Sequence, residues 1–171
     1  MNFMKLFDFA ALKNVNWAKP ALETKNVFTW ISLGMISLML LFVFFPWFGA
    51  YFGAYSEITG DGTFRLGITL WNGILGFLFA GAAMVGWLYK QPAIVFWASV
   101  TAMLLGFIGM FGYTSLSADG YTWSAAEVEV IVEGFRGRIE TTHIGAVLFF
   151  LASLGSSVVA CLDAVLPKKA E

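Results

Sequence analysis

The sequence predicts an all-α membrane protein: a bundle of four transmembrane helices, with a small β-hairpin or sheet formed by its two outer loops. Of the 171 residues, 59% are hydrophobic and only 12% are charged, against roughly 45–50% and about 25% in soluble domains. Four apolar runs approach or exceed the roughly 20 residues that a bilayer-spanning helix needs. Aromatic residues gather near both ends of these runs, as at membrane interfaces. This composition excludes a soluble enzyme, a nucleic-acid-binding protein and a disordered chain.

The whole chain, residues 1–171, is expected to form one integral membrane domain. Residues 2–13 place Phe3, Leu6 and Phe7 against Lys5 and Lys13, which predicts a short amphipathic helix in the inner headgroup region. A helix that docks a partner protein is the alternative. The mixed residues before the first apolar run indicate a retained span rather than a cleavable signal peptide.

The predicted spans are residues 28–45, 68–89, 93–113 and 144–166. Pro46 ends the first span, because proline cannot continue a helix. Gln91 and Pro92 leave only a very short turn between the second and third spans, so these two helices are expected to form an antiparallel hairpin.

Lysine and arginine set the expected orientation. Seven of the ten lie at the termini and at the turn around Lys90, and three lie in the loops on the opposite side. Both termini are therefore expected to be cytoplasmic. Because no Asn-x-Ser/Thr acceptor site occurs and Cys161 is the only cysteine, we expect a bacterial cytoplasmic membrane.

The outer loops, residues 46–67 and 114–143, hold most of the polar surface. Thr59-Gly60-Asp61-Gly62 is a turn signal between two segments with aromatic and β-branched residues, which predicts a β-hairpin. Residues 124–133 are ambiguous: 128–133 partly alternate like a strand, whereas 124–127 match a helix capping box, and three valines favour the strand. The two loops are expected to form a small sheet resting on the bundle. Its predicted surface residues are Trp47, Trp71, Trp123, Glu127, Glu129, Glu133, Arg136 and Arg138.

The spans carry no ionisable residue near their middle. Because such residues usually mark ion pathways and proton relays, this argues against a proton-coupled transporter. A single histidine cannot supply bis-histidine haem ligation, and no Cys/His cluster has metal-ligand spacing, so neither cofactor nor metal is expected. Glu140 and His143 could form an acid/base pair on one helical face. An interfacial histidine beside solvated charges is the favoured interpretation.

Small residues recur in the spans at the spacing that lets helix backbones approach closely in lipid. They could serve only the internal bundle, but several rows leave one free for a neighbouring protein. Asn72, the most polar residue within a span, is expected to bond a neighbouring helix or to line a small cavity. The predicted helix-packing or partner-interface residues are Gly76, Ala80, Ala82, Gly86, Ala102, Gly106, Ala152, Ser156 and Ala160.

Residues 44–48 (FFPWF), 67–73 (GITLWNG) and 144–147 (IGAV) resemble small bacterial four-helix membrane proteins of unassigned function. The topology, with two structured outer loops and a short inner turn, also resembles the claudin and peripheral-myelin-protein group. Leu70-Trp71 is similar to part of that group's Gly-Leu-Trp element, although the paired loop cysteines are missing. The resemblance implies a four-helix fold and no particular function.

The leading hypothesis is a non-catalytic accessory or scaffold subunit of a larger membrane assembly. Its expected partners are the lipid bilayer and other membrane protein subunits or further copies of this chain, with no nucleic acid. On this hypothesis, leucine at Ala152 or Ala160 should weaken assembly without unfolding the protein. The alternatives are a small oligomeric channel or transporter for a neutral or amphiphilic solute, supported by Asn72, and a lipid-directed enzyme using Glu140 and His143.

Overall fold

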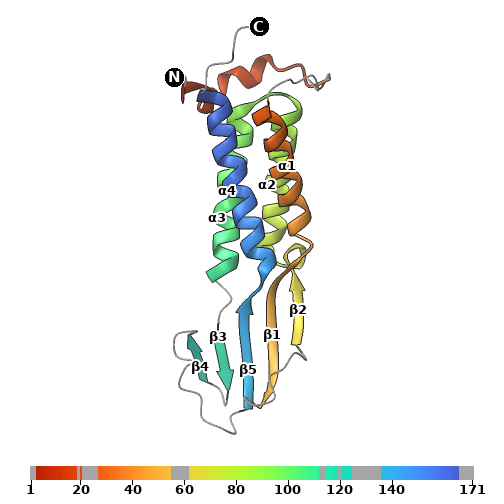
Figure 1. The fold of residues 1–171 in the computed structure, drawn as a ribbon, viewed down its shortest axis with the longest axis vertical. Helices are drawn as coiled ribbons and strands as arrows, with labels where there is room; N and C mark the ends of the chain where they lie inside the picture. The colour runs from red at the N-terminus through yellow and green to blue at the C-terminus, as the bar shows by residue number, and fades with distance from the viewer. Residues whose placement is uncertain are drawn as a thin grey trace.

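The computed structural model describes residues 3–18, 20, 27–54, 62–111, 115–118, 121–124 and 136–165. Figure 1 shows an elongated molecule, with a helical bundle at one end and a β-sheet at the other. The N-terminal segment and the end of the last helix both lie at the end of the bundle that faces away from the sheet, which we call the terminal end.

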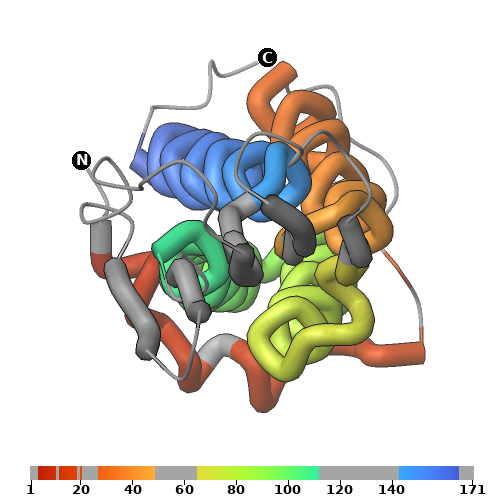
Figure 2. Tube along the Cα trace, turned by 90° about the horizontal axis from the view of Figure 1, so that it is seen from below, coloured from red at the N-terminus to blue at the C-terminus, as the bar shows by residue number. Residues whose placement is uncertain are grey.

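Four helices form the bundle: α1 (Val27–Phe42), α2 (Trp71–Leu88), α3 (Pro92–Phe111) and α4 (Ile144–Val165). They form a ring in which α1 packs mainly against α4 and less against α2 (Figure 2). The predicted four-helix bundle is confirmed. Three helices, α2, α3 and α4, are long and apolar enough to cross a membrane. The fourth, α1, has 16 residues, a length of about 24 Å.

Two helices are shorter than predicted at the end near the sheet: α1 ends earlier and α2 starts later than the predicted spans. The first span was expected to reach residue 45, but α1 ends at Phe42, where Phe44 N and Phe45 N donate three residues back, to Leu41 O and Phe42 O. This tight turn leads into a strand that begins at Pro46. Similarly, α2 starts at Trp71 rather than at residue 68, because Gly67–Thr69 form a 3-10 turn, η4.

The sheet has five antiparallel strands in the order β2-β1-β5-β3-β4. The first outer loop forms the predicted hairpin of β1 (Pro46–Ala54) and β2 (Gly62–Leu66). The second contributes β3 (Ser115–Ala118), β4 (Tyr121–Ser124) and β5 (Arg136–Thr142), and β5 pairs with β1. Both loops therefore form one sheet, as expected. Of the predicted turn at residues 59–62, only Gly62 is described, and it lies in β2. Of the ambiguous segment 124–133, only Ser124 is described, and it lies in β4.

The sheet prolongs the bundle instead of resting on it, because strands and helices follow one another almost without a linker. β1 leaves α1 after a three-residue turn, and β5 reaches α4 through His143 alone. The neighbouring helices α1 and α4 thus continue as the neighbouring strands β1 and β5 (Figure 1).

The N-terminal segment is not the single helix predicted for residues 2–13. It consists of two 3-10 turns, η1 (Phe3–Leu6) and η2 (Ala10–Asn14), with residues 7–9 between them. We call residues 3–18 the N-terminal strap, because they cross the terminal end of the bundle along α3 and α2 (Figures 1 and 2). Contacts with the bundle, described below, hold the strap in this irregular path.

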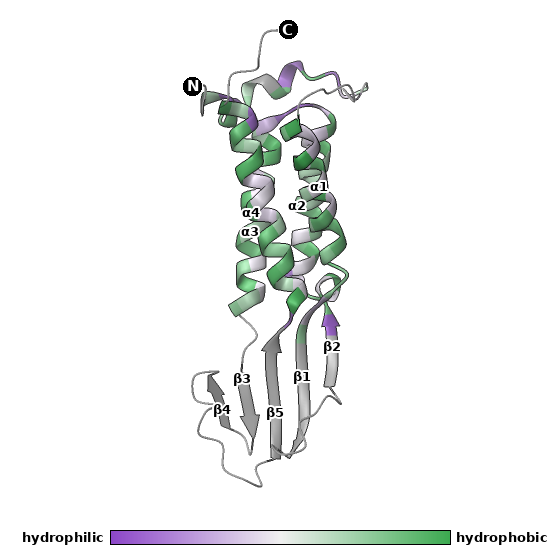
Figure 3. Cartoon of the chain, in the orientation of Figure 1, coloured by the Kyte–Doolittle hydropathy of each residue, from purple (hydrophilic) through white to green (hydrophobic). Residues whose placement is uncertain are grey.

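The core consists of two apolar clusters stacked along the bundle. One, near the sheet, contains Trp47 and Phe149; the other, nearer the terminal end, contains Ile36, Ala83 and Trp87. All four helices also carry large apolar side chains that are exposed, and Figure 3 shows the helices mostly in green, the colour of hydrophobic residues. A helix that is apolar on all sides is typical of a membrane span or of the core of a large protein.

Candidate functional site

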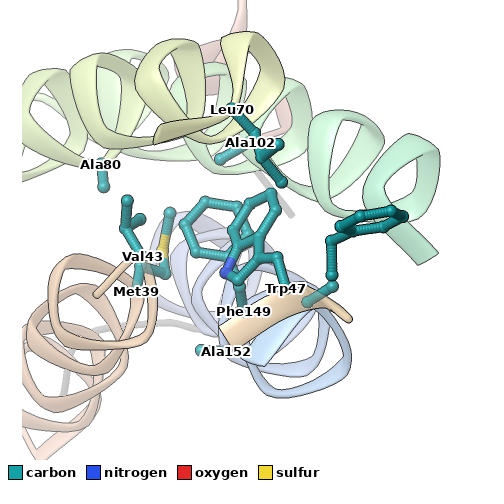
Figure 4. Close-up of a cluster of buried hydrophobic side chains, with 10 residues drawn as sticks. Met39, Val43, Trp47, Leu70, Ala80, Ala102, Phe149 and Ala152 are labelled. Atoms are coloured by element: carbon teal, nitrogen blue, oxygen red, sulfur yellow. The ribbon is translucent and has the colours of Figure 1, made fainter. Parts of the chain in front are cut away.

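Trp47 lies at the junction between the bundle and the sheet, and its side chain is 0% exposed. Its indole Nε1 donates a hydrogen bond of 2.9 Å to Phe42 O at the end of α1. The ring packs against Phe149 of α4 with a centroid separation of 4.9 Å, and Figure 4 shows both rings among the buried side chains. The expectation of Trp47 at the loop surface is therefore wrong. The tight turn after α1 directs the indole inward, where its polar group finds a carbonyl partner.

Three glycines from different elements make room for the Trp47 ring. A Cβ at Gly67, Gly109 or Gly145 would lie 2.5, 3.0 or 2.9 Å from atoms of that ring. These glycines belong to η4, α3 and α4. Because any side chain at these positions would occupy the space of the indole, the ring can be enclosed by backbone on several sides.

Backbone hydrogen bonds close the same junction. His143 N, just before α4, donates to Trp47 O over 3.0 Å, and Ile68 N donates to Val43 O over 2.8 Å. Together with the Trp47 side chain, these bonds connect the ends of α1 and α4 to the first residues of the sheet. Position and orientation of the sheet relative to the bundle are thus fixed by several independent contacts.

The predicted helix-packing residues face the interior of the chain's own bundle. Eight of the nine are buried and Ala82 is half-buried. Gly76 of α2 and Gly106 of α3 both contact Phe149, since a Cβ there would lie 2.8 and 3.0 Å from its ring. Leucine at Ala152 or Ala160 would disturb this internal packing, so those variants do not separate assembly from folding. The rows that we assigned in part to a neighbour are used within the chain.

Two polar contacts join α3 to its neighbours inside the bundle. Asn72 is fully buried, and its Nδ2 donates to Leu105 O at 3.4 Å, which is the predicted bond to a neighbouring helix. The hydroxyls of Ser99 and Ser156 are 2.8 Å apart in the α3–α4 interface. Ser99 was not identified from the sequence, because a lone serine in an apolar run has no distinctive spacing. Such bonds contribute about 0.6 kcal/mol on average within membranes.

A double-mutant cycle on Ser99 and Ser156 tests this second contact. We expect Ser99→Ala and Ser156→Ala each to lower the free energy of unfolding by roughly 1 kcal/mol, since each leaves a buried hydroxyl without its partner. The double variant should lose less than the sum, with a coupling of about 0.6 kcal/mol. Thermal unfolding in a mild detergent measures all four proteins, and strictly additive losses would contradict the contact.

The other predicted surface residues lie in α2, in β4 and β5, or outside the described residues. Trp71 is 57% exposed at the start of α2, as expected. Trp123 lies in β4, Arg136 and Arg138 lie in β5, and Glu127, Glu129 and Glu133 lie outside the described residues.

The expected placement of Glu140 and His143 on one helical face is wrong. Glu140 lies in β5, while His143 lies between β5 and α4 and is half-buried. The two residues therefore do not share the helical face that the hypothesis required. Among the described residues, no three His, Cys, Asp or Glu side chains gather closely enough to hold a metal ion.

The resemblance to small bacterial four-helix proteins and to the claudin group stays a prediction, because it depends on short motifs and topology. Comparisons with known proteins provide no independent test of it. No protein-family model matches the chain, and neither the curated proteins nor the solved structures include one with significant similarity to it.

Proposed function

We propose that this chain is an integral membrane protein that acts as a non-catalytic accessory or scaffold subunit of a larger membrane assembly. The observation that carries the proposal is that the interior of the bundle is filled while α1 keeps two small residues, Gly34 and Ser37, on its outer side. Both termini are proposed to be cytoplasmic, in a bacterial inner membrane, which follows from the lysine distribution of the sequence.

The filled interior favours a scaffold over a conduit within one chain. Phe149 occupies the space between Gly76 and Gly106, and Trp47 closes the end toward the sheet. The buried polar groups Ser99, Ser156 and Asn72 bond neighbouring helices. Since Asn72 was the polar residue that supported an oligomeric channel, its burial leaves the channel or transporter as the weaker alternative.

The two small residues lie on the outer side of α1. A Cβ at Gly34 would meet nothing within 4 Å, and Ser37, three residues later, is exposed. Residues three or four apart lie on one side of a helix, and small residues on an outer face allow another helix to approach closely in lipid. In addition, α1 contacts α2 less extensively than it contacts α4. We therefore assign the lateral partner to the outer side of α1.

Gentle extraction from native membranes, followed by mass analysis of the intact particle and its components, tests the function directly. A foreign subunit in fixed stoichiometry supports the accessory role and identifies the process it serves. A homogeneous particle of this chain alone would instead favour the channel, and solute flux into liposomes would then be measured. A monomer in native membranes would overturn both.

The proposed partner face is tested by the double variant Gly34→Leu/Ser37→Leu. Leucines on this face should keep the second helix at a distance, and we expect the amount of co-purified partner to fall roughly tenfold, a loss of about 1.4 kcal/mol. Gly81→Leu is the matched control, because Gly81 of α2 also has open space at its Cβ position but lies on another helix. Equal partner recovery from both variants would show that α1 is not the contact face.

A further inference from the structure

A cleft lies at the terminal end of the bundle, between the N-terminal strap and the turn that joins α2 to α3. Its volume is about 240 Å³, far more than the roughly 15 Å³ that one water molecule requires by this measure. Lys5 and Asp8 of the strap line one side, and residues 90–93 line the other. The side chains of Lys5 and Lys90 are exposed, and neither belongs to the partner face described above.

Two anchors hold the strap wall of this cleft in place. Leu6, between the lining residues Lys5 and Asp8, is 1% exposed, and its carbonyl oxygen accepts a hydrogen bond of 2.9 Å from Trp97 Nε1. Farther along the strap, Trp17 O accepts a hydrogen bond of 2.6 Å from the Tyr89 hydroxyl. The cleft is therefore preformed, and a ligand would not have to order the strap.

The lining favours an anion. Lys5 and Lys90 contribute two cationic groups and Asp8 one carboxylate, so the lining carries a formal net charge of +1. Pro92 and Ala93, the first two residues of α3, also line the cleft, which therefore lies at a helix N-terminus with its partial positive charge.

The turn between α2 and α3 contains a lysine, Lys90, in a backbone conformation that favours glycine. Lys90 has a φ of 52°, the one positive value among the non-glycine residues described. A position just after a helix with this conformation usually holds glycine or asparagine, because a Cβ makes it unfavourable. A conformational outlier of this kind is a reason to look for a function.

Exposed aromatic side chains near the cleft favour a position at the level of lipid phosphates. Phe7, Phe9 and Trp17 of the strap are exposed, and Trp30 of α1 is exposed near the same end. Tryptophan and amphipathic segments of this kind settle at the boundary between headgroups and acyl chains. Basic pockets at this level are suited to the headgroups of anionic lipids.

We propose that the cleft between the N-terminal strap and the α2–α3 turn binds the phosphate of an anionic phospholipid, with Lys5 and Lys90 as its cationic ligands. The proposal rests on the membrane insertion that forms part of the proposed function, and it is independent of the accessory role. A native particle without a foreign subunit would overturn the accessory role and leave the lipid site untouched.

The test uses the full chain, purified in a mild detergent and freed of lipid. Phosphatidylglycerol and phosphatidylcholine with the same acyl chains are titrated, and bound lipid is counted by native mass spectrometry. We expect phosphatidylglycerol to bind in preference. Its affinity should fall about twenty-five-fold in Lys5→Gln/Lys90→Gln, at roughly fivefold for each lysine. Lys13→Gln is the matched control, because Lys13 is exposed on the same strap but does not line the cleft, and it should change the affinity less than twofold.

A second variant separates ligand loss from misfolding. Lys90→Gly removes the ammonium but suits the left-handed turn, so the melting temperature without lipid should not fall while the affinity for phosphatidylglycerol drops roughly fivefold. Equal binding of phosphatidylcholine, or an equal loss in Lys13→Gln, would overturn the proposal. Inorganic phosphate that competes with the lipid at the same affinity would also overturn it, by identifying a site for free phosphate.

Discussion

Replacement of Trp47 by alanine is expected to lower the free energy of unfolding by about 3–5 kcal/mol, the usual range for removing a buried tryptophan. The side chain is 0% exposed and packs against Phe149. The surrounding backbone cannot collapse easily into the space, because the η4 turn and the start of α4 are each held by hydrogen bonds at the junction. Thermal unfolding in a mild detergent, followed by far-ultraviolet circular dichroism, gives the change.

Two further variants identify the origin of this loss. Trp71→Ala removes the same side chain from an exposed position at the start of α2, and a change within about 0.5 kcal/mol is expected there. Trp47→Phe keeps an aromatic ring but removes the indole donor to Phe42 O, and should cost about 1 kcal/mol for the hydrogen bond plus a smaller packing loss. Equal losses in Trp47→Ala and Trp71→Ala would contradict the burial of the junction.

The helices and the sheet's hairpin were predictable because each depends on a local pattern. Apolar runs of about 20 residues locate α2, α3 and α4, and the Gly-rich turn between aromatic segments locates β1 and β2. The end of α1 and the start of α2 were predicted wrongly, because the tight turns there have the same apolar composition as the helices beside them. Hydrogen bonds to distant carbonyls, such as that of Ile68 N to Val43 O, decide where the helix stops.

The junction around Trp47 could not be predicted from local pattern. A tryptophan after a helix-ending proline has the same sequence context whether it lies in a membrane interface or in a core. What buries Trp47 is the absence of side chains at Gly67, Gly109 and Gly145, three positions far apart in the sequence. Their convergence is a property of the folded topology.

Small-residue rows were correctly recognised as packing surfaces, but the pattern does not state which neighbour they contact. Ala152 and Ala160 were predicted to serve either internal packing or a partner interface, and both are buried within the chain. Gly34 was not identified as an interface residue, although it is open on the outer side of α1. The spacing of small residues predicts that another helix can pack closely. Only the arrangement of the helices shows whether that helix belongs to the same chain.

Alanine substitutions at Gly73 and Gly81 of α2 are expected to change the stability of the protein in opposite directions. A Cβ at Gly73 would lie 1.9 Å from Gly67 O and 2.4 Å from Gly67 C, all backbone atoms of the η4 turn. A Cβ at Gly81 would meet nothing within 4 Å. We expect Gly73→Ala to destabilise the protein by about 3 kcal/mol, the upper part of the range for overpacking. Gly81→Ala should stabilise it by up to about 1 kcal/mol, because alanine favours the helix more than glycine does.

The large loss at Gly73 is expected because the η4 turn has no free direction in which to move. Gly67 N donates to Phe45 O over 3.1 Å and Ile68 N donates to Val43 O over 2.8 Å, so a shift that relieves the new methyl group would stretch the bonds between α1 and the turn. The Trp47 ring also restricts Gly67, because a Cβ at that position would lie 2.5 Å from its atoms. Thermal unfolding of the two variants in the same detergent decides the matter. A stabilising Gly73→Ala would mean that α2 and the η4 turn do not approach as closely as the fold requires.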